Sequence, residues 1–563
     1  MEEIIFDVPD YGEKFIADFY EGAMVQLYER RSAADTVCNR QLVRGYIVRL
    51  TDTELHLHLS YKQRNRDFFS LDTTYAIEKD STDSSFQSAR RGLFALLTAP
   101  QERRELLLCQ RAPRFDTSVK LCGDYGARTN AIVLPAMQAQ DYYLLVGPPG
   151  TGKTNVALRA MVQEFLTSAC LRGERPNLLL AAYTNRAVDE ICQMLQGAEI
   201  DFLRLGIEQT CSEEVRQNLF VNRAAGMKNR AEVSQLLQDQ QVIVGTVATL
   251  TSHTELFNLK QFDLAILDEA SQVLEPQIMA LLAHPTAVRR FIMIGDHKQL
   301  PAVVMQRAEQ TVVHDEALRS IGLVDLRNSL FERLHGFVAR TPEVATLAAG
   351  LLDHQGRMHR EIAAFVNERF YEGRLSVVPL DHQEGALDYA DPQTPMEQFV
   401  ATTRMGFVHV PAPELSDNVK ANKMEAETVA DIVEALIHLN ARSEKSLNLS
   451  KQLGVIVPFR NQISMVRASL RNRGVADVDD ITIDTVECYQ GSQRDYIVFT
   501  TTISRPYQLD ILSVCQQVGT TEVDRKLNVA ITRARKQFFL VGNRDLLSRN
   551  ALYADLISRC DVR

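Results

Sequence analysis

The chain has 563 residues and a formal net charge of −10, and its 45% hydrophobic and 24% charged content is ordinary for a globular protein. The negative charge argues against a protein that coats nucleic acid through bulk electrostatics, although it does not exclude a local basic groove. No apolar run approaches the ~20 residues of a membrane span, and none of the nine cysteines forms a C-x-x-C pair, which disfavours a membrane protein, a zinc ribbon and a disulfide framework.

The N-terminal stretch MEEIIFDVPDYGEKF is acidic and lacks the apolar core of a secretion signal. Together with the scattered cysteines it predicts a reducing intracellular compartment, which is the cytoplasm or, in a eukaryote, the nucleus. The length alone suggests roughly four domains.

Residues 41–60 have the pattern of strands, because three leucines alternate with His56 and His58. Two histidines at this spacing could bind a metal, but no third ligand lies nearby, so we expect them to face solvent. Residues 84–99 then carry apolar side chains at helical spacing and end before Pro100. The first 120 residues are therefore predicted to be a small β unit followed by helices.

From residue 142 the chain shows short apolar runs separated by helical stretches, which is the pattern of parallel strands buried on both faces. The second set of runs begins near residue 454, so the sequence predicts two α/β units. Residues 384–400 are turn-rich and are predicted to be a surface connection. The runs are 142–146, 177–183, 241–246, 262–269 and 290–296, then 454–459, 481–486, 496–501 and 537–543.

The string GPPGTGKT matches the phosphate-binding P-loop and stands between a predicted strand and a predicted helix. Backbone N–H groups of such a loop face an anion at a helix N-terminus. Lys153 is placed for the β- and γ-phosphates of a nucleotide and Thr154 for Mg²⁺. The nucleotide-binding residues predicted here are Gly147, Pro148, Pro149, Gly150, Thr151, Gly152, Lys153 and Thr154.

Two acidic residues, Asp268 and Glu269, end a later strand, where open α/β sheets bind their ligands. Asp268 could hold Mg²⁺, and Glu269 could take the proton of an attacking water. A solvated acidic turn is the alternative. The next strand is followed by Gln299, which could orient that water or could be an ordinary loop residue.

Near the end of the chain, RKLNVAITRAR (525–535) places four basic residues around a short apolar run. It could be a helix with a solvated edge, or a device that reaches a highly negative partner.

Seven motifs decide between these alternatives, because they occur in a fixed order: GPPGTGKT, YTNRAVDEI, DEAS, GDHKQLPAV, HQGRMH, TVECYQGSQRD and LNVAITRAR. Over residues 140–550 the chain resembles the superfamily 1 helicases of the 5′-to-3′ branch, in particular the nonsense-mediated-decay RNA helicase and the eukaryotic replication helicase–nuclease. The preceding residues are more weakly similar to the β-barrel and stalk of the latter group.

The resemblance implies two RecA-like motor domains, at 121–345 and 346–563, after a β-barrel and helical stalk at 1–120. It also implies that residues 207–240 are a helical insertion over a nucleic-acid track, although an exposed hairpin is the alternative. It implies ATP and Mg²⁺ as cofactors, with Thr154 and Asp268 as the metal-binding residues.

For the catalytic site, the resemblance implies that Glu269, Gln299, Arg357 and Arg533 act on ATP, with Gly491 beside the nucleotide. A guanidinium suits this role because its rigid fork of donors matches phosphate oxygens. Arg525 and Arg535 could pair with acidic residues or with nucleic acid. The residues that the resemblance places on a single strand of nucleic acid are Thr184, Asn185, Thr246, Pro458 and Thr485.

Three departures bear on substrate choice. Gly356 replaces an aromatic residue that can stack on adenine, Gln493 replaces an acidic residue near the ribose, and no glutamine that reads adenine is evident upstream of the P-loop. These predict loose discrimination among nucleoside triphosphates. No cysteine/histidine-rich zinc module is evident, which together with the similarity to the barrel and stalk favours DNA over RNA. No nuclease site is evident before residue 140, so a nuclease would belong to a domain or subunit outside this chain.

The sequence thus predicts a monomeric ATP-dependent motor on single-stranded DNA, with no membrane partner. An RNA helicase of the same family is one alternative, and a nucleotide-dependent switch or scaffold without unwinding activity is another.

Overall fold

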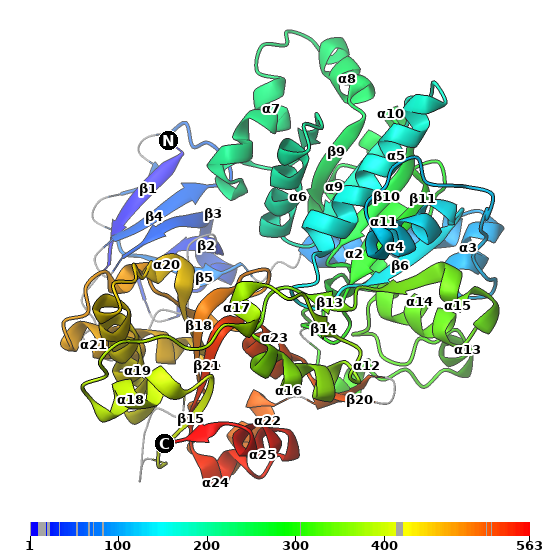
Figure 1. Cartoon of the computed structure of the whole chain (residues 1–563). Helices are drawn as coiled ribbons and strands as arrows, with labels where there is room; N and C mark the ends of the chain where they lie inside the picture. The colour runs from blue at the N-terminus through cyan, green and yellow to red at the C-terminus, as the bar shows by residue number, and fades with distance from the viewer. Residues whose placement is uncertain are drawn as a thin grey trace. The chain divides into compact units, whose positions relative to one another are not determined.

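The structure, a computed structural model, describes residues 2–8, 19, 23–32, 34–51, 54–65, 68–70, 73–80, 84–304, 306–412, 420–513, 515–518 and 521–563. The chain divides into two compact units, Met1–Gln87 and Ser88–Arg563. Within the described residues, no helix is long and apolar enough to cross a membrane. Figure 1 shows the elements of both units along the chain.

The first unit is a five-stranded antiparallel sheet in the order β1-β4-β3-β2-β5. The predicted alternation in β4 is confirmed, because Leu55, Leu57 and Leu59 are buried while His56 and His58 are half-buried. The bounds are β1 (Glu3–Asp7), β2 (Met24–Glu29), α1 (Val37–Arg40), β3 (Gln41–Leu50), β4 (Glu54–Leu59) and β5 (Tyr75–Lys79).

The predicted barrel is not confirmed, since β1 and β5 show no pairing in the part of the chain that the structure describes. The sheet is nonetheless curved enough to bring Phe6 of β1 within 5.6 Å of Tyr75 of β5, measured between ring centroids. His56 lies 3.1 Å from a Glu3 carboxylate oxygen. No group of three or more metal-ligating side chains occurs among the described residues.

A seven-stranded parallel sheet follows, in the order β12-β6-β11-β10-β7-β9-β8. All five predicted runs between 142 and 296 are strands of this sheet. The strands are β6 (Tyr142–Val146), β7 (Leu178–Ala182), β8 (Leu203–Arg204), β9 (Val242–Thr246), β10 (Phe262–Asp268), β11 (Val288–Gly295) and β12 (Ala349–Leu351).

Both faces of this sheet are covered, which explains why its strands are apolar without alternation. One face packs on α4 (Ala127–Gln138), α5 (Arg159–Leu171) and α6 (Asn185–Gly197). The other packs on α3 (Gln101–Leu107), α9 (Val247–Ser252), α11 (Glu275–Leu282), α14 (Leu330–Ala339) and α15 (Pro342–Ala348). We call the elements from α3 to β12 the first lobe.

The elements from β13 onward form the second lobe, around a six-stranded parallel sheet in the order β17-β16-β18-β21-β15-β22. Its strands are β15 (Met405–His409), β16 (Leu453–Val457), β17 (Thr482–Thr485), β18 (Arg494–Thr500), β21 (Ala534–Gly542) and β22 (Asp561–Val562). One face packs on α16 (Arg360–Phe370), α23 (Arg525–Thr532) and α25 (Ala551–Ser558), the other on α19 (Lys423–Arg442) and α21 (Arg460–Asn472). The predicted α/β class with two parallel sheets is therefore confirmed.

A buried carboxylate fixes the start of α19 to the end of β18. Glu425 accepts hydrogen bonds from the Thr501 and Thr502 backbone N–H groups, at 3.0 and 2.7 Å, and from the Thr500 hydroxyl. Burial raises the pKa of Glu425 to about 7, although these donors favour its charged form.

Two features differ from the sequence predictions. The predicted turn-rich connection at 384–400 ends early, because α18 (Pro395–Thr402) begins after a capping box formed by Thr394 and Glu397. Helix α2 (Ser84–Thr98) forms as predicted, but the apolar residues Phe86, Phe94 and Leu97 are largely exposed.

The segment 208–240 contains short helices, as its texture predicted: η4 (Glu208–Thr210), η5 (Glu213–Asn218), α7 (Phe220–Arg223) and α8 (Arg230–Asp239). The other short elements are η3 (Lys153–Leu158), α10 (Leu256–Leu259), η6 (Ala270–Gln272), α12 (Ala308–Thr311), α13 (Glu316–Ser320), β13 (His354–Gln355), β14 (Ser376–Val377), α17 (Asp381–Glu384), α20 (Leu449–Gln452), η7 (Val478–Asp480), η8 (Pro506–Gln508), α22 (Leu509–Leu512), β19 (Cys515–Val518), β20 (Thr521–Asp524) and α24 (Arg544–Leu547).

Candidate active site

The P-loop connects the end of β6 to the helical turn η3, which continues into α5. Gly150 and Gly152 have φ angles of 74° and 80°, in the left-handed region that favours glycine. A Cβ on Gly147 would lie 2.3 Å from Cγ of Lys153, so this position also requires glycine for its close approach. The loop therefore has the glycines and the helix N-terminus that a phosphate cradle requires.

The two acidic residues at the end of β10 contact the P-loop. Thr154 Oγ1 donates to Asp268 Oδ2 at 3.0 Å, and Lys153 Nζ donates to Glu269 Oε1 at 3.0 Å. Gln272 Nε2 donates to the other oxygen of Glu269 at 2.9 Å. Glu269 itself has a φ of 51°, which is unusual for a residue with a side chain and places its carboxylate where these donors meet it.

The pKa values of the two carboxyl groups are shifted in opposite directions. Burial and the charge of Glu269 raise the pKa of Asp268 to about 6. Burial also acts to raise the pKa of Glu269, but Lys153 and Gln272 stabilise its carboxylate, so that pKa lies below its ordinary value. Burial acts to lower the pKa of Lys153, but the charges of Glu269, Asp268 and Asp296 outweigh it and raise that pKa. Glu269 is therefore ionised at neutral pH, as a base must be.

The hydroxyl of Thr154 and the carboxylate of Asp268 fit Mg²⁺, since both are oxygen ligands and lie beside the phosphate loop. Magnesium prefers one or two such protein ligands together with substrate phosphates, so this pair suffices.

A buried hydrogen-bonded chain joins the loop after β11 to the second lobe. Arg533 Nη2 donates to Gln299 Oε1 at 3.2 Å, and Gln299 Nε2 donates to Asp296 Oδ2 at 2.7 Å. All three side chains are buried. The structure thus brings Arg533 from the end of α23 to the glutamine that the sequence predicted near the γ-phosphate.

Two further members of this chain were missed at the level of sequence. Tyr371, just after α16, donates its hydroxyl to Asp296 Oδ2 at 2.6 Å. Asn528 of α23 donates to the Tyr371 hydroxyl at 3.1 Å and to the Lys298 carbonyl at 2.7 Å. Asn528 lies inside the motif LNVAITRAR, so its position in the sequence could have pointed to it. Tyr371 lies outside all seven motifs.

Arg357 approaches the P-loop from the second lobe. The Gly356 N–H donates to the Gly150 carbonyl at 2.8 Å, and a Cβ on Gly150 would lie 2.4 Å from Cβ of Arg357. The Arg357 guanidinium donates to Gln493 Oε1 at 2.9 Å and to the Thr532 carbonyl at 3.2 Å. Gln493, which replaces an acidic residue of the family motif, therefore holds a predicted catalytic arginine.

Burial lowers the pKa of Arg357 to about 10, against the opposing charges of Glu190 and Glu269. Burial, followed by the positive charge of Arg357, places the pKa of Arg533 well below its usual value. Two guanidinium groups thus lie close enough to repel each other, and both feel the charge of Glu269. Such a pair would be stabilised by an anion of high charge.

The other two arginines of the motif 525–535 pair with acidic residues. Arg525 forms an ion pair with Glu332 of the first lobe, and Arg535 Nη1 lies 3.0 Å from Asp495 Oδ1. The motif is a largely buried helix, α23, followed directly by β21. Its most exposed basic side chain, Lys526, pairs with Glu487.

The residues predicted to contact nucleic acid all lie at carboxyl ends of strands. Thr184 and Thr246 follow β7 and end β9, and both are helix N-caps whose side chains accept backbone N–H groups. Asn185 is the first residue of α6. Pro458 follows β16, and Thr485 ends β17.

In the second lobe, the residues predicted for nucleotide and for nucleic acid lie at opposite edges of the sheet. Gly491 precedes β18 and Arg533 precedes β21, which is the amino edge. Pro458 and Thr485 lie at the carboxyl edge, because all strands of this sheet run parallel. In the first lobe, both sets lie at the carboxyl edge, on different strands.

Two family models, each described as an AAA domain, match this chain. One matches residues 127–226 and 216–307, and the other matches residues 326–545. The first region contains the P-loop, Asp268, Glu269 and Gln299, and the second contains Arg357, Gly491 and Arg533.

Three curated relatives are DNA replication ATP-dependent helicase/nucleases. JHS1 of Arabidopsis thaliana is 28% identical over 86% of this chain and 34% of its own length. DNA2 of Bos taurus is 29% identical over 90% of this chain and 47% of its own, and DNA2 of Homo sapiens is 29% identical over 89% and 46%. The two AAA-domain models together cover residues 127–307 and 326–545, and over this region the chain resembles the superfamily 1 helicases. The chain spans about a third to a half of the length of these relatives.

The two domain matches and the helicase/nuclease relatives agree with the two parallel sheets of the structure. Among solved structures, the arterivirus nonstructural protein 10 helicase matches 97% of this chain and 78% of its own, with a TM-score of 0.38 and 11% identity.

Proposed function

We propose that this chain is the motor of a DNA helicase, which hydrolyses ATP between its two lobes and moves 5′-to-3′ along a single strand. The observation that supports this most directly is the meeting of two residue sets. Lys153 and Thr154 of the P-loop donate hydrogen bonds to Glu269 and Asp268 at the end of β10. Arg533 of the second lobe donates to Gln299 of the first lobe, which also contains the P-loop.

In the proposed reaction the P-loop N–H groups and Lys153 bind the β- and γ-phosphates. Bound Mg²⁺, held by Thr154 and Asp268, would neutralise phosphate charge. Glu269 takes a proton from the attacking water, which Gln299 orients. Arg357 and Arg533 stabilise the charge that develops on the transferred phosphoryl group, an effect worth about 10³–10⁵ in rate in related reactions.

Coupling to movement follows from the separation of these groups over two lobes. ATP attracts Arg357 and Arg533 towards the P-loop, and loss of the γ-phosphate removes that attraction. Because Thr184, Thr246, Pro458 and Thr485 belong to both lobes, closing and opening would change the spacing of the proposed contacts to the strand. Small hydroxyl groups and backbone N–H groups suit contacts that do not depend on sequence.

The relatives named above are DNA replication enzymes, which favours DNA as the substrate. We carry the polarity, the monomeric state and a nuclease outside these residues over from the family resemblance. The proposal also retains the boundaries 1–120, 121–345 and 346–563, loose discrimination among nucleoside triphosphates, and the helical insertion as a cover of the track.

The test is ATP hydrolysis and unwinding by the wild type and by Glu269→Gln, on DNA and RNA duplexes with a 5′ or a 3′ tail. Loss of the base should lower kcat by roughly 10²–10⁴ and leave ATP binding intact. Wild-type hydrolysis should rise many-fold with single-stranded DNA, and only 5′-tailed DNA should unwind. Indifference to nucleic acid would instead identify a nucleotide-dependent switch, and near-normal turnover by the variant would remove Glu269 as the base.

A further inference from the structure

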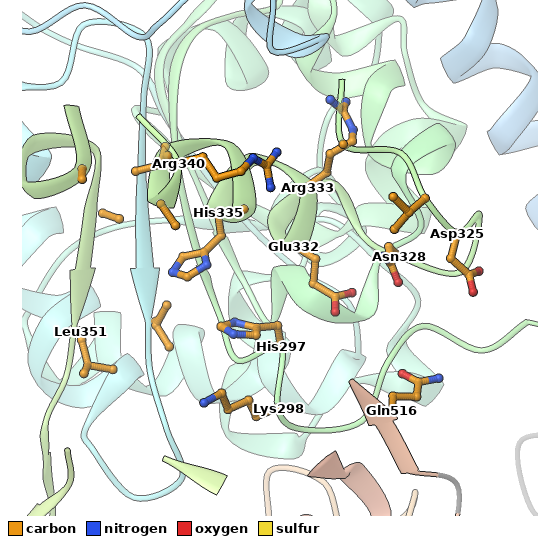
Figure 2. A pocket seen from close by; sticks show the side chains of 18 of the residues that line it. His297, Lys298, Asp325, Asn328, Glu332, Arg333, His335, Arg340, Leu351 and Gln516 are labelled. Carbon is orange, nitrogen blue, oxygen red and sulfur yellow. The ribbon is translucent and has the colours of Figure 1, made fainter. Parts of the chain in front are cut away.

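A cavity of about 1230 Å³ lies between the two lobes of Ser88–Arg563, apart from the P-loop. Figure 2 shows it framed by His297, Lys298 and His335, with Arg340 and Arg333 above. The first lobe contributes α14, the loop before it and β12, and the second contributes Tyr371–Leu375, Gln516 and Arg525. Of the catalytic and nucleotide-binding residues proposed above, none lines the cavity.

The lining carries an excess of positive charge, which is unusual in a chain of net charge −10. Seven lysine and arginine residues line it against three acidic residues. Three of the cations pair with those three acids: Lys298 with Glu372, Arg327 with Asp325, and Arg525 with Glu332. A fourth, Arg333, pairs with Glu275 outside the lining.

The remaining cations have no carboxylate partner within the described residues. Arg319 donates to the Val313 carbonyl, whereas the guanidinium groups of Arg340 and Arg374 form no hydrogen bond or ion pair there. Arg340 belongs to the first lobe and Arg374 to the second. The guanidinium of Arg340 lies against Gly322 and Gly336, where an added Cβ would be 3.3 and 3.4 Å from its nitrogens. These glycines leave room for the planar group beside the cavity.

A histidine of the lining adds a second observation. His297 lines the cavity and is half-buried; its Nδ1 is shielded from solvent and has no hydrogen-bond partner among the described residues. Its ring lies 4.9 Å from that of His335, which also lines the cavity (Figure 2). Burial lowers the pKa of both histidines, so they are neutral near pH 7. Because Nδ1 is shielded, a neutral His297 with its proton on Nε2 could donate from that nitrogen to a ligand oxygen.

We propose that this cavity is a second anion-binding site, which takes a small phosphate-bearing molecule between Arg340, Arg374 and His297. Guanidinium forks match phosphate oxygens, and the volume is ample for a ligand of nucleotide size. A nucleic-acid strand fits less well, because none of the five residues proposed for the strand lines this cavity. A ligand held from both lobes would oppose their separation, and it would contact Lys298 next to Gln299.

Binding of inorganic pyrophosphate to the full chain tests the proposal, with the P-loop first saturated by Mg²⁺ and a slowly hydrolysed ATP analogue. Calorimetry should find one pyrophosphate per wild-type chain beyond the analogue, with affinity that falls as salt rises. The double variant R340A/R374A should weaken this affinity at least about tenfold, since each charge-assisted contact contributes on the order of 1.5–3 kcal/mol. The analogue should bind both proteins equally.

Arg549→Ala is the matched control, because Arg549 is exposed and its side chain has no partner among the described residues. It should bind pyrophosphate as the wild type does. Absence of the extra pyrophosphate in the wild type, or equal affinity in the double variant, would overturn the proposal. Displacement of pyrophosphate by a single-stranded oligonucleotide that the double variant no longer binds would assign the cavity to the nucleic-acid track instead. None of these readouts depends on ATP hydrolysis.

Discussion

At the scale of single residues, the contact between the lobes depends on buried polar side chains that bond to one another. Asp296 accepts from both Gln299 and Tyr371, and Asn528 reaches the Tyr371 hydroxyl. Removing one of these groups would leave its partner buried without a hydrogen bond, which costs stability. Asp296 therefore fixes the amide of Gln299, which leaves the glutamine oxygen directed at Arg533.

Tyr371→Phe tests this positioning role. Loss of the hydroxyl removes a bond to a carboxylate, which contributes about 1.5–3 kcal/mol, and frees the Asp296–Gln299 pair to reorient. We expect kcat for ATP to fall about tenfold while KM changes less than twofold. Steady-state hydrolysis at several ATP concentrations separates the two constants.

Tyr553→Phe is the control, because Tyr553 is equally buried in the second lobe and its hydroxyl has no partner among the described residues. Removing an unsatisfied hydroxyl should leave kcat unchanged and should not lower the melting temperature. A similar loss of kcat in both variants would show that Tyr371 has no specific role in positioning.

At the scale of elements, the P-loop is also a docking surface for the second lobe. Gly150→Ala would force a side chain into a left-handed conformation and against Cβ of Arg357. Misplacement by about 1 Å near a reacting centre can cost about 100-fold in rate, so we expect at least that loss of ATP turnover. Rapid-quench measurement of hydrolysis would give the value.

Gly173→Ala separates the clash from the backbone strain. Gly173 has a similar φ of 71°, but an added Cβ would meet nothing within 4 Å. It should lose only about 1–2 kcal/mol of stability and keep its turnover. Equal activity of the two alanine variants would contradict the docking role of Gly150.

The junction of α19 and β18 should make stability depend on pH. The pKa of Glu425 is raised from 4.5 to about 7, so the folded protein binds a proton that the unfolded chain has released between these values. The stability from this group is therefore present below about pH 4.5 and is lost as pH rises through 7.

Glu425→Gln should remove this dependence, which amounts to on the order of 3 kcal/mol between pH 4.5 and pH 8. Urea unfolding of both proteins across that range would measure it. Parallel curves for wild type and variant would show that Glu425 does not titrate as the structure indicates.

The sequence predicted most of the central strands because those strands are buried on both faces and have a distinct composition. It missed β8, β12 and β22, which have only two or three residues each, and β15, which was not recognised among the helices around it. The Thr394-x-x-Glu397 capping signal of α18 was present but overlooked beside Pro392 and Pro395.

The candidate site was predicted where residues lie in motifs, since motif spacing carries the local geometry of strand, loop and helix. Tyr371 could not be found in this way, because its partners Asp296 and Asn528 are far away in the sequence. The cavity between the lobes could not be predicted either. Its excess of positive charge can be recognised only when the ion pairs among its lining residues are known.

At the scale of the whole molecule, the two lobes differ in where they place the proposed catalytic residues and the proposed contacts to nucleic acid. In the second lobe, the proposed catalytic side chains lie at the amino edge of the sheet and the proposed strand contacts at the carboxyl edge. A five-residue strand such as β16 separates these edges by about 17 Å, at ~3.3 Å per residue.

The sheet of the second lobe can therefore serve as a lever arm. If it pivots where Arg533 bonds to Gln299, a tilt of about 10° carries the far edge roughly 3 Å for a ~17 Å arm. Sub-ångström movements around the phosphates would thus be amplified into displacements large enough to move a nucleic-acid strand. The six paired strands form a stiff sheet, so this displacement is not lost through deformation of the lobe.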